Sequence, residues 1–317
     1  MSLSLLPSSL KANRHLTIML ALGLAYFVLG ALCLAFDQRQ MLGEYVWIKP
    51  CKFGLSIATY AASLIWLAGY VGNYKPLFDL CARRALLGAV VELTSLAVQA
   101  GNLLPGVQGT GAFHETVNFA LLLAIKLGIM PVALLMPVTL YFLFKQKDLP
   151  PVLGSSLRWA AFIATLGMIP GVIMVLPGSH QLALSHHGGF GHGMSMALGV
   201  RTPISPWLGW STTGGDLRAA HFFGLHALQV LPLAALAIKR YLPLWNTQRQ
   251  TLLITNLGIT YTALLSLLTW QALLGESLFH PGAETIRLFL SVFTISISAV
   301  ILTTPRSRER LSLQSEA

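Results

Sequence analysis

The sequence predicts an all-helical bundle that crosses a membrane about eight times, with both termini on the cytoplasmic side. Of the 317 residues, 55% are hydrophobic and only 10% are charged, whereas a soluble domain has about 25% charged residues. The chain also contains eight apolar runs, and a membrane-spanning helix needs about 20 mostly apolar residues. This composition excludes an ordinary soluble enzyme, a disordered protein and a disulfide-stapled secreted domain.

The apolar runs are predicted to be helices, because lipid offers no partner for unpaired backbone groups and the runs lack the alternation of barrel strands. The first run is longer than the apolar core of a cleaved signal peptide, about 7–15 residues, so we expect it to remain as a helix. The whole chain, residues 1–317, is predicted to be one membrane domain. The predicted spans are 16–36, 53–71, 85–104, 117–143, 157–177, 219–238, 251–274 and 284–304.

Lysine and arginine set the predicted orientation. With the N-terminus inside, most of the 21 Lys and Arg residues fall in segments on the cytoplasmic side, as the positive-inside rule requires. The net charge of +10 is therefore assigned to helix ends, and no nucleic-acid partner is predicted. We expect a multi-pass protein of the bacterial inner membrane whose partner is the lipid bilayer; its oligomeric state does not follow from the sequence.

Residues 178–217 are predicted to form a periplasmic loop rich in glycine and histidine. His186, His187 and His192 are followed by Met194 and Met196, and His and Met side chains bind copper or zinc. The histidines have no fixed ligand spacing, so two interpretations stay open. The loop either holds a metal ion or is a solvated, glycine-rich segment.

The third span carries a polar stripe. Its residues Glu92, Ser95, Gln99 and Asn102 lie within about 80° of one another on a helix. An ionisable group inside a span costs about 2.5–3.5 kcal/mol on insertion scales. The stripe is either the wall of a substrate, proton or cofactor pocket, or a set of hydrogen bonds between helices.

The fourth span contributes Lys126 and is preceded by His114. Lys126 lies at about the depth of Glu92, which predicts a buried Glu92–Lys126 ion pair, either functional or structural. His114 is either a ligand at the mouth of a pocket or a residue of the helix start.

The sixth span begins with a group of polar residues. His221 and His226 are separated by about 140° on a helix, so they cannot both bind one ion from a regular helix. We assign catalytic roles to Glu92, Lys126, Asp216 and Arg218, and cofactor binding to His114, His221, His226, Gln99 and Gln229. All these residues fall in the predicted outer half of the membrane, which predicts a polar pocket open to the periplasm.

Three stretches resemble a family of uncharacterised bacterial inner-membrane proteins. They are Trp47–Phe53, which reads WIKPCKF, the Gln99–Asn118 stretch, and Gly209–Gln229, which reads GWSTTGGDLRAAHFFGLHALQ. The middle stretch reads Phe-His-Glu-Thr where the family has Ser-His-Phe-Asn. The resemblance implies a polytopic inner-membrane protein and no particular activity.

Three functions remain open from the sequence. The first is a membrane redox or metal-dependent enzyme, since imidazole binds transition metals and haem iron. The second is a proton-coupled transporter of small molecules that uses Glu92 and Lys126. The third is a non-catalytic assembly or sensory protein. The chain has no GxSxG, HExxH or P-loop motif, so no hydrolase is predicted.

Overall fold

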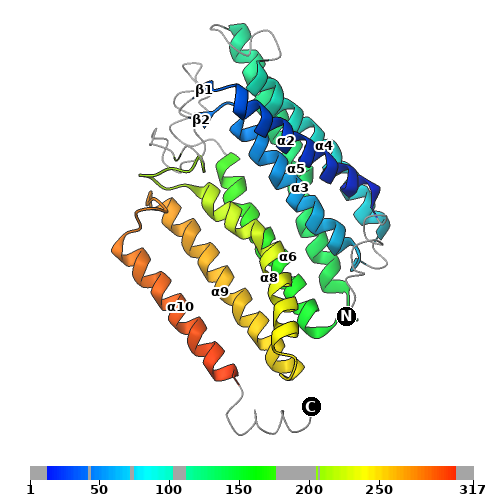
Figure 1. Cartoon of the computed structure of the whole chain (residues 1–317), viewed down its shortest axis with the longest axis vertical. Coiled ribbons are helices and arrows are strands. Elements are labelled where there is room, and N and C mark those ends of the chain that lie inside the picture. The colour runs from blue at the N-terminus through cyan, green and yellow to red at the C-terminus, as the bar shows by residue number, and fades with distance from the viewer. Residues whose placement is uncertain are drawn as a thin grey trace. The chain divides into compact units, whose positions relative to one another are not determined.

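The structure is a computed structural model that describes residues 13–41, 44–71, 75–102, 112–175, 205 and 208–304. In this part, the chain forms eight helices and one short hairpin (Figure 1). The helices are α2 (Arg14–Phe36), α3 (Ile48–Ala68), α4 (Lys75–Gly101), α5 (Ala112–Lys145), α6 (Pro151–Val175), α8 (Leu217–Tyr241), α9 (Thr247–Leu273) and α10 (Ala283–Thr303).

Seven of the helices in the described part are long and apolar enough to cross a membrane; they are α2, α3, α5, α6, α8, α9 and α10. The eighth, α4, is 27 residues long but is not among the seven, and it carries the charged residues Lys75, Asp79, Arg83, Arg84 and Glu92. The multi-pass helical class is confirmed. The number of crossings and the cytoplasmic position of the termini stay predictions.

Asparagine and aspartate side chains mark where several helices begin. Asn13 precedes α2, and its side chain accepts hydrogen bonds from the backbone N–H groups of His15 and Leu16. Asp216 caps α8, and Asn246 caps α9 in the same way. Such caps satisfy backbone N–H groups that have no partner within the helix.

A two-residue antiparallel hairpin is the exception to the predicted all-helical fold. Strand β1 (Gln40–Met41) pairs with β2 (Glu44–Tyr45), with Gln40 opposite Tyr45. The hairpin lies between α2 and α3, and the sequence does not predict it because strands of two residues have no recognisable pattern.

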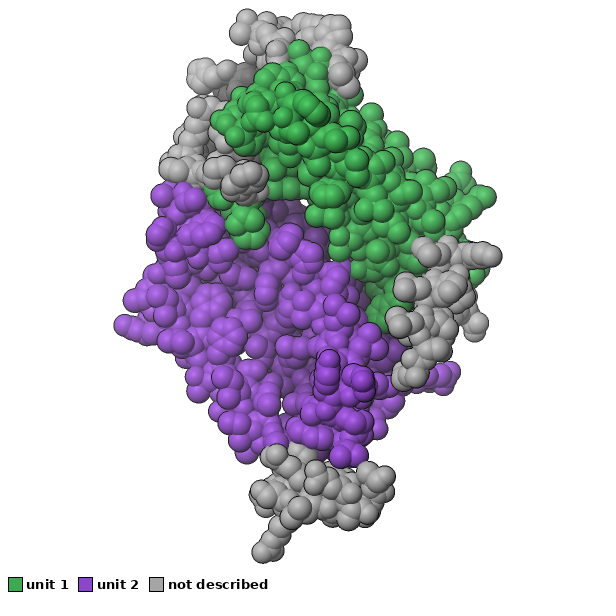
Figure 2. Space-filling model, in the orientation of Figure 1, with its two compact units in different colours: residues 1–142, 177–194, 203–210 green, residues 143–176, 195–202, 211–317 purple. Residues whose placement is uncertain are grey.

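The chain packs as two compact units (Figure 2), and the single membrane domain stays a prediction. Unit 1 comprises residues 1–142, 177–194 and 203–210, and unit 2 comprises residues 143–176, 195–202 and 211–317. In unit 1, α2 packs closely on α3. In unit 2, α6 packs closely on α8, and α9 packs on α6, α8 and α10.

Small residues allow these close helix contacts. A Cβ at Gly23 of α2 would lie 2.7 Å from the Gly54 carbonyl oxygen of α3, and a Cβ at Gly167 of α6 would lie 2.8 Å from the Gly224 Cα of α8. Membrane helices associate largely through such backbone approach, because lipid removes the hydrophobic drive between them. Outward-facing apolar side chains, for example Leu290 and Ile295 of α10, suit contact with lipid.

Candidate functional site

The predicted site residues fall in both units, and we describe each set within its own unit. Unit 1 contains Glu92, Gln99 and Lys126, and unit 2 contains Asp216, Arg218, His221, His226 and Gln229. The loop residues His186, His187 and His192 lie outside the described residues. His114 belongs to α5, but its side chain is also outside them. The metal site in the loop and the pocket shared by all these residues therefore stay predictions.

Glu92 is the most unusual side chain of unit 1. It is 0% exposed, and neither of its carboxylate oxygens has a hydrogen-bond partner. The structure therefore does not form the predicted hydrogen-bonded Glu92–Lys126 pair. Buried polar groups are nearly always hydrogen-bonded, and an exception requires an explanation.

The contact between α4 and α5 explains why the pair does not form. A Cβ at Gly128 of α5 would lie 2.9 Å from the backbone nitrogen of Glu92 and 3.1 Å from its Cβ. Lys126 is only two residues from Gly128, so the predicted depth is right. Two residues correspond to about 160° around a helix, and Lys126 therefore points away from Glu92.

The rest of the α4 stripe becomes more exposed toward the C-terminal end of the helix. Ser95 is 8% exposed, Gln99 is half-buried and Asn102 is exposed. Asn102 has a left-handed backbone with φ 54°, which asparagine tolerates better than most residues. The stripe thus connects the buried carboxyl to the end of α4.

In unit 2, His221 of α8 is held against α6. Its Nδ1 donates a hydrogen bond to the Gly167 carbonyl oxygen at 2.7 Å. This approach depends on Gly171, because a Cβ there would lie 2.9 Å from Nδ1. With Nδ1 donating, a neutral ring has its lone pair on Nε2, the arrangement that histidine ligands of metals commonly use.

His226 has a different environment from His221. Its Nδ1 donates to Oε1 of Gln229, one turn along α8, at 3.0 Å, and its ring lies 4.1 Å from the ring of Phe222. The two histidines therefore have separate partners, as their spacing along the helix predicts. To bind a metal ion, each needs further ligands from elsewhere, whereas a haem iron can be held by one axial histidine.

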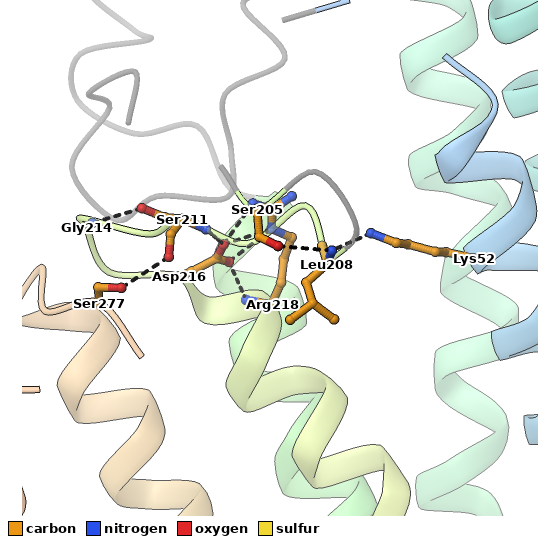
Figure 3. A network of polar contacts seen from close by, with 8 residues as sticks. All are labelled: Lys52, Ser205, Leu208, Ser211, Gly214, Asp216, Arg218 and Ser277. Atoms are coloured by element: carbon orange, nitrogen blue, oxygen red, sulfur yellow. Dashed lines mark hydrogen bonds and ion pairs between the residues drawn. The ribbon is translucent and has the colours of Figure 1, made fainter. Parts of the chain in front are cut away.

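Asp216 and Arg218 belong to a network of polar contacts at the start of α8 (Figure 3). The Asp216 carboxylate accepts bonds from the guanidinium of Arg218 at 2.7–3.2 Å, from the backbone N–H of Arg218 and from that of Ser211. The Ser277 hydroxyl, from the loop after α9, donates to the Ser211 carbonyl oxygen at 3.2 Å. These contacts give Asp216 the role of a helix cap, and the predicted catalytic role of both residues stays a prediction.

We expect Asp216→Ala to lower the free energy of unfolding by about 2–3 kcal/mol, because it removes the cap and the partner of Arg218. Unfolding in detergent, followed by circular dichroism, measures the change. Glu284→Ala is the matched control, since Glu284 and its partner Arg287 are 64% and 74% exposed, and exposed pairs contribute about 0–1 kcal/mol. A purely catalytic Asp216 would leave the unfolding free energy unchanged.

A second cluster of polar contacts, in unit 1, is not predicted as a site from the sequence. Asp37 follows α2, and its carboxylate accepts bonds from the Arg39 guanidinium at 2.6 and 2.8 Å and from the Trp47 indole at 2.7 Å. Arg39 also donates to the Ala100 carbonyl oxygen near the end of α4. Trp47 lies in a stretch that carries the family resemblance, and this was the available signal. Nearby, Lys52 of α3 donates to the Leu208 carbonyl oxygen at 2.7 Å (Figure 3).

The hydrogen bonds from Arg39 and Trp47 hold the pKa of Asp37 well below its ordinary value of 3.8. A lowered folded-state pKa stabilises the protein above the ordinary pKa, and this stabilisation is lost as the pH falls. We therefore expect the unfolding temperature to fall between about pH 5 and pH 3, and to fall less steeply in Asp37→Asn. Glu284→Gln should keep the slope of the unaltered protein, and an unchanged slope in Asp37→Asn would contradict the assignment.

In the part of the chain that the structure describes, no group of three or more His, Cys, Asp or Glu residues is placed to hold a metal ion. A metal site with three protein ligands of these types that includes His221 or His226 would therefore need ligands from the remaining segments, whereas a haem iron can be held by one axial histidine. A buried amide oxygen, Oε1 of Gln271, also lacks a hydrogen-bond partner, while its Nε2 donates to the Ser277 carbonyl oxygen at 2.8 Å.

Comparison with known proteins adds no relative. No protein-family model, no curated protein and no solved structure matches this chain. The family resemblance therefore stays a prediction. The helices themselves show the class. The chain is a multi-pass membrane protein.

Proposed function

We propose that this membrane protein is a proton-coupled carrier of a small molecule and that Glu92 is its proton-binding group. The observation that carries the proposal is the carboxyl of Glu92, which is 0% exposed with both oxygens unpartnered. Burying an ionised carboxylate without a partner costs far more than burying the neutral acid. Intramembrane carboxyls of this kind mark ion pathways and proton relays.

The contacts of Glu92 favour a carrier over a purely structural role. A structural carboxyl would hold helices together through hydrogen bonds, and Glu92 makes none. An unpartnered carboxyl beside a backbone-to-backbone contact, at Gly128, can take up or release a proton without breaking a bond. Binding of the proton then changes the charge at a helix interface, which is how a carrier couples a proton to a change of conformation.

Reconstituted vesicles test the proposal. A pH gradient is imposed across the vesicle membrane, and amino acids, organic acids, sugars and organic cations are added in turn while an internal dye reports the pH. We expect at least one class to dissipate the gradient, and Glu92→Gln to slow this dissipation by at least about 100-fold. Glu284→Gln is the control, because that carboxylate is exposed and bonded to Arg287.

Two outcomes overturn the proposal: dissipation in Glu92→Gln at the rate of the unaltered protein, or no dissipation with any of the four classes. Infrared spectroscopy gives a second readout that does not need the transported solute. A carboxylic acid C=O band that changes with pH and disappears in Glu92→Gln shows that Glu92 binds the proton.

His221 favours a second candidate function, a metal- or haem-dependent enzyme. Its Nδ1 hydrogen bond to the Gly167 carbonyl oxygen orients the ring as in histidine ligands of metals. The visible spectrum of the purified protein, oxidised and reduced, together with its metal content, tests this candidate. A Soret band or a stoichiometric metal that is lost in His221→Ala would support it, and a colourless, metal-free protein would contradict it.

A further inference from the structure

The face of α4 that carries Glu92 changes character at this residue. Toward the N-terminal end of the helix, the buried residues of the same side are Phe78, Ala82 and Ala85, all apolar and at most 1% exposed. Toward the C-terminal end, the same face carries the polar side chains of Ser95 and Gln99 beside the buried Leu96 and Ala100, and Asn102 follows the end of the helix at Gly101. Glu92 therefore lies between buried apolar residues on its N-terminal side and a partly polar face on its C-terminal side.

Exposure along the polar segment increases steadily away from Glu92. Ser95 is 8% exposed, Gln99 is half-buried and Asn102 is exposed. Glu92 lies nine residues before the end of α4 at Gly101, a distance of about 14 Å along the helix. Polar side chains at each turn over this distance provide partners for water or for a proton in transit.

The opposite direction is closed by backbone contact. A Cβ at Gly88 would collide with the carbonyl oxygen of Gly128 and would lie 3.3 Å from Cγ of Pro131. A Cβ at Gly128 would lie 2.7 Å from the carbonyl oxygen of Gly88. Two helices this close leave no space for water between α4 and α5 at Gly88.

The facing helix α5 carries a polar side chain, Asn118, near the level of the end of α4. Gly128 packs at Glu92 and Pro131 packs at Gly88, so the two helices run antiparallel. Asn118 lies ten residues before Gly128, about 15 Å along α5, which brings it to the level of Asn102. It lies within about 80° of Gly128 around the helix, on the face that also carries the buried Leu121.

The other titratable side chains near Glu92 have hydrogen-bond partners of their own or point away from it. Lys126 points away from Glu92, and the Tyr60 hydroxyl of α3 donates to the Val132 carbonyl oxygen of α5 at 3.0 Å. The Tyr26 hydroxyl of α2 is bonded to Thr94, on the opposite side of α4 from Glu92. Arg39, near the end of α4, is bonded to Asp37 and to the Ala100 carbonyl oxygen.

From this arrangement, we infer that protons reach Glu92 from the Asn102 end of α4, along Ser95 and Gln99, and not from the Lys75 end. The predicted orientation places the Asn102 end on the periplasmic side. This inference rests on the proposed function, and it adds the side from which protons reach Glu92. The closed Gly88–Gly128 contact is then the barrier that a carrier must open toward the other side.

Cysteine labelling tests the direction of access in full-length protein whose native Cys33, Cys51 and Cys81 are replaced by alanine. Ser95→Cys and Gln99→Cys are treated with a membrane-impermeant thiol reagent from each side of sealed vesicles. Leu87→Cys is the matched control on the same helix, because Leu87 is 57% exposed but faces lipid. The cysteine thiolate attacks the thiol reagent, and the thiol ionises readily only where water reaches it.

We expect labelling of positions 95 and 99 only from the Asn102 side, at least about tenfold faster than labelling of position 87. Labelling from the Lys75 side, from both sides or from neither side would overturn the inference. If the cysteine-free variant does not fold, the rate at which the Glu92 infrared band responds to external pH is measured instead. Ser95→Val with Gln99→Leu should then slow the response about tenfold, and Leu87→Val should not.

Labelling does not depend on transport, so the two proposals fail separately. One-sided labelling together with normal transport by Glu92→Gln would support the one-sided path and overturn the carrier function. Loss of transport in Glu92→Gln together with two-sided labelling would support the carrier function and overturn the one-sided path.

Discussion

Glu92→Leu is expected to raise the unfolding temperature of the protein while it abolishes proton-coupled transport. The buried carboxyl has no hydrogen-bond partner, and an unsatisfied buried polar group costs about 1–3 kcal/mol. Leucine removes this cost and keeps a similar volume. At roughly 2–4 °C per kcal/mol for a domain of 150–250 residues, the unfolding temperature should rise by about 3–10 °C.

Ser95→Ala serves as the control for Glu92→Leu, because it changes the same buried face without removing the carboxyl. We expect it to change the unfolding temperature by less than about 2 °C. Thermal unfolding in detergent, followed by circular dichroism, measures both variants. A lower unfolding temperature in Glu92→Leu would show that the carboxyl contributes to stability and would remove the reason to assign it a function.

Gly128→Val is expected to destabilise unit 1 strongly. A Cβ at this position would lie 2.7 Å from the Gly88 carbonyl oxygen and 2.9 Å from the Glu92 backbone nitrogen. These neighbours are backbone atoms that cannot move aside, so α4 and α5 must separate. Overpacking of this kind costs about 1–3 kcal/mol or more, and the unfolding temperature should fall by about 3–10 °C.

Gly69→Ala is the matched control for Gly128→Val. Its added Cβ would meet a single atom, the Trp66 carbonyl oxygen, at 3.3 Å. We expect a change below about 2 °C. Equal destabilisation by the two substitutions would contradict the backbone contact between α4 and α5, and with it the barrier that we infer beside Glu92.

The positions of the helices follow from the sequence because they depend on local properties. The run 16–36 becomes α2 (Arg14–Phe36), and the run 219–238 becomes α8 (Leu217–Tyr241). An apolar run of about 20 residues has one stable form in lipid, a helix, and no other part of the chain is needed to specify it. The shared face of Glu92, Ser95 and Gln99 follows in the same way from helical periodicity.

The partners of the site residues depend on which face each helix turns toward its neighbour. Only the tertiary structure determined this. Lys126 lies at the predicted depth of Glu92, but Gly128 faces Glu92 instead, because two glycines let α4 and α5 approach closely at that point. Asp216 likewise became a helix cap through Ser211 and Arg218. Sequence spacing determines where a residue lies along and around its own helix. The face that one helix turns toward another is set by packing between residues far apart in the chain, which periodicity does not encode.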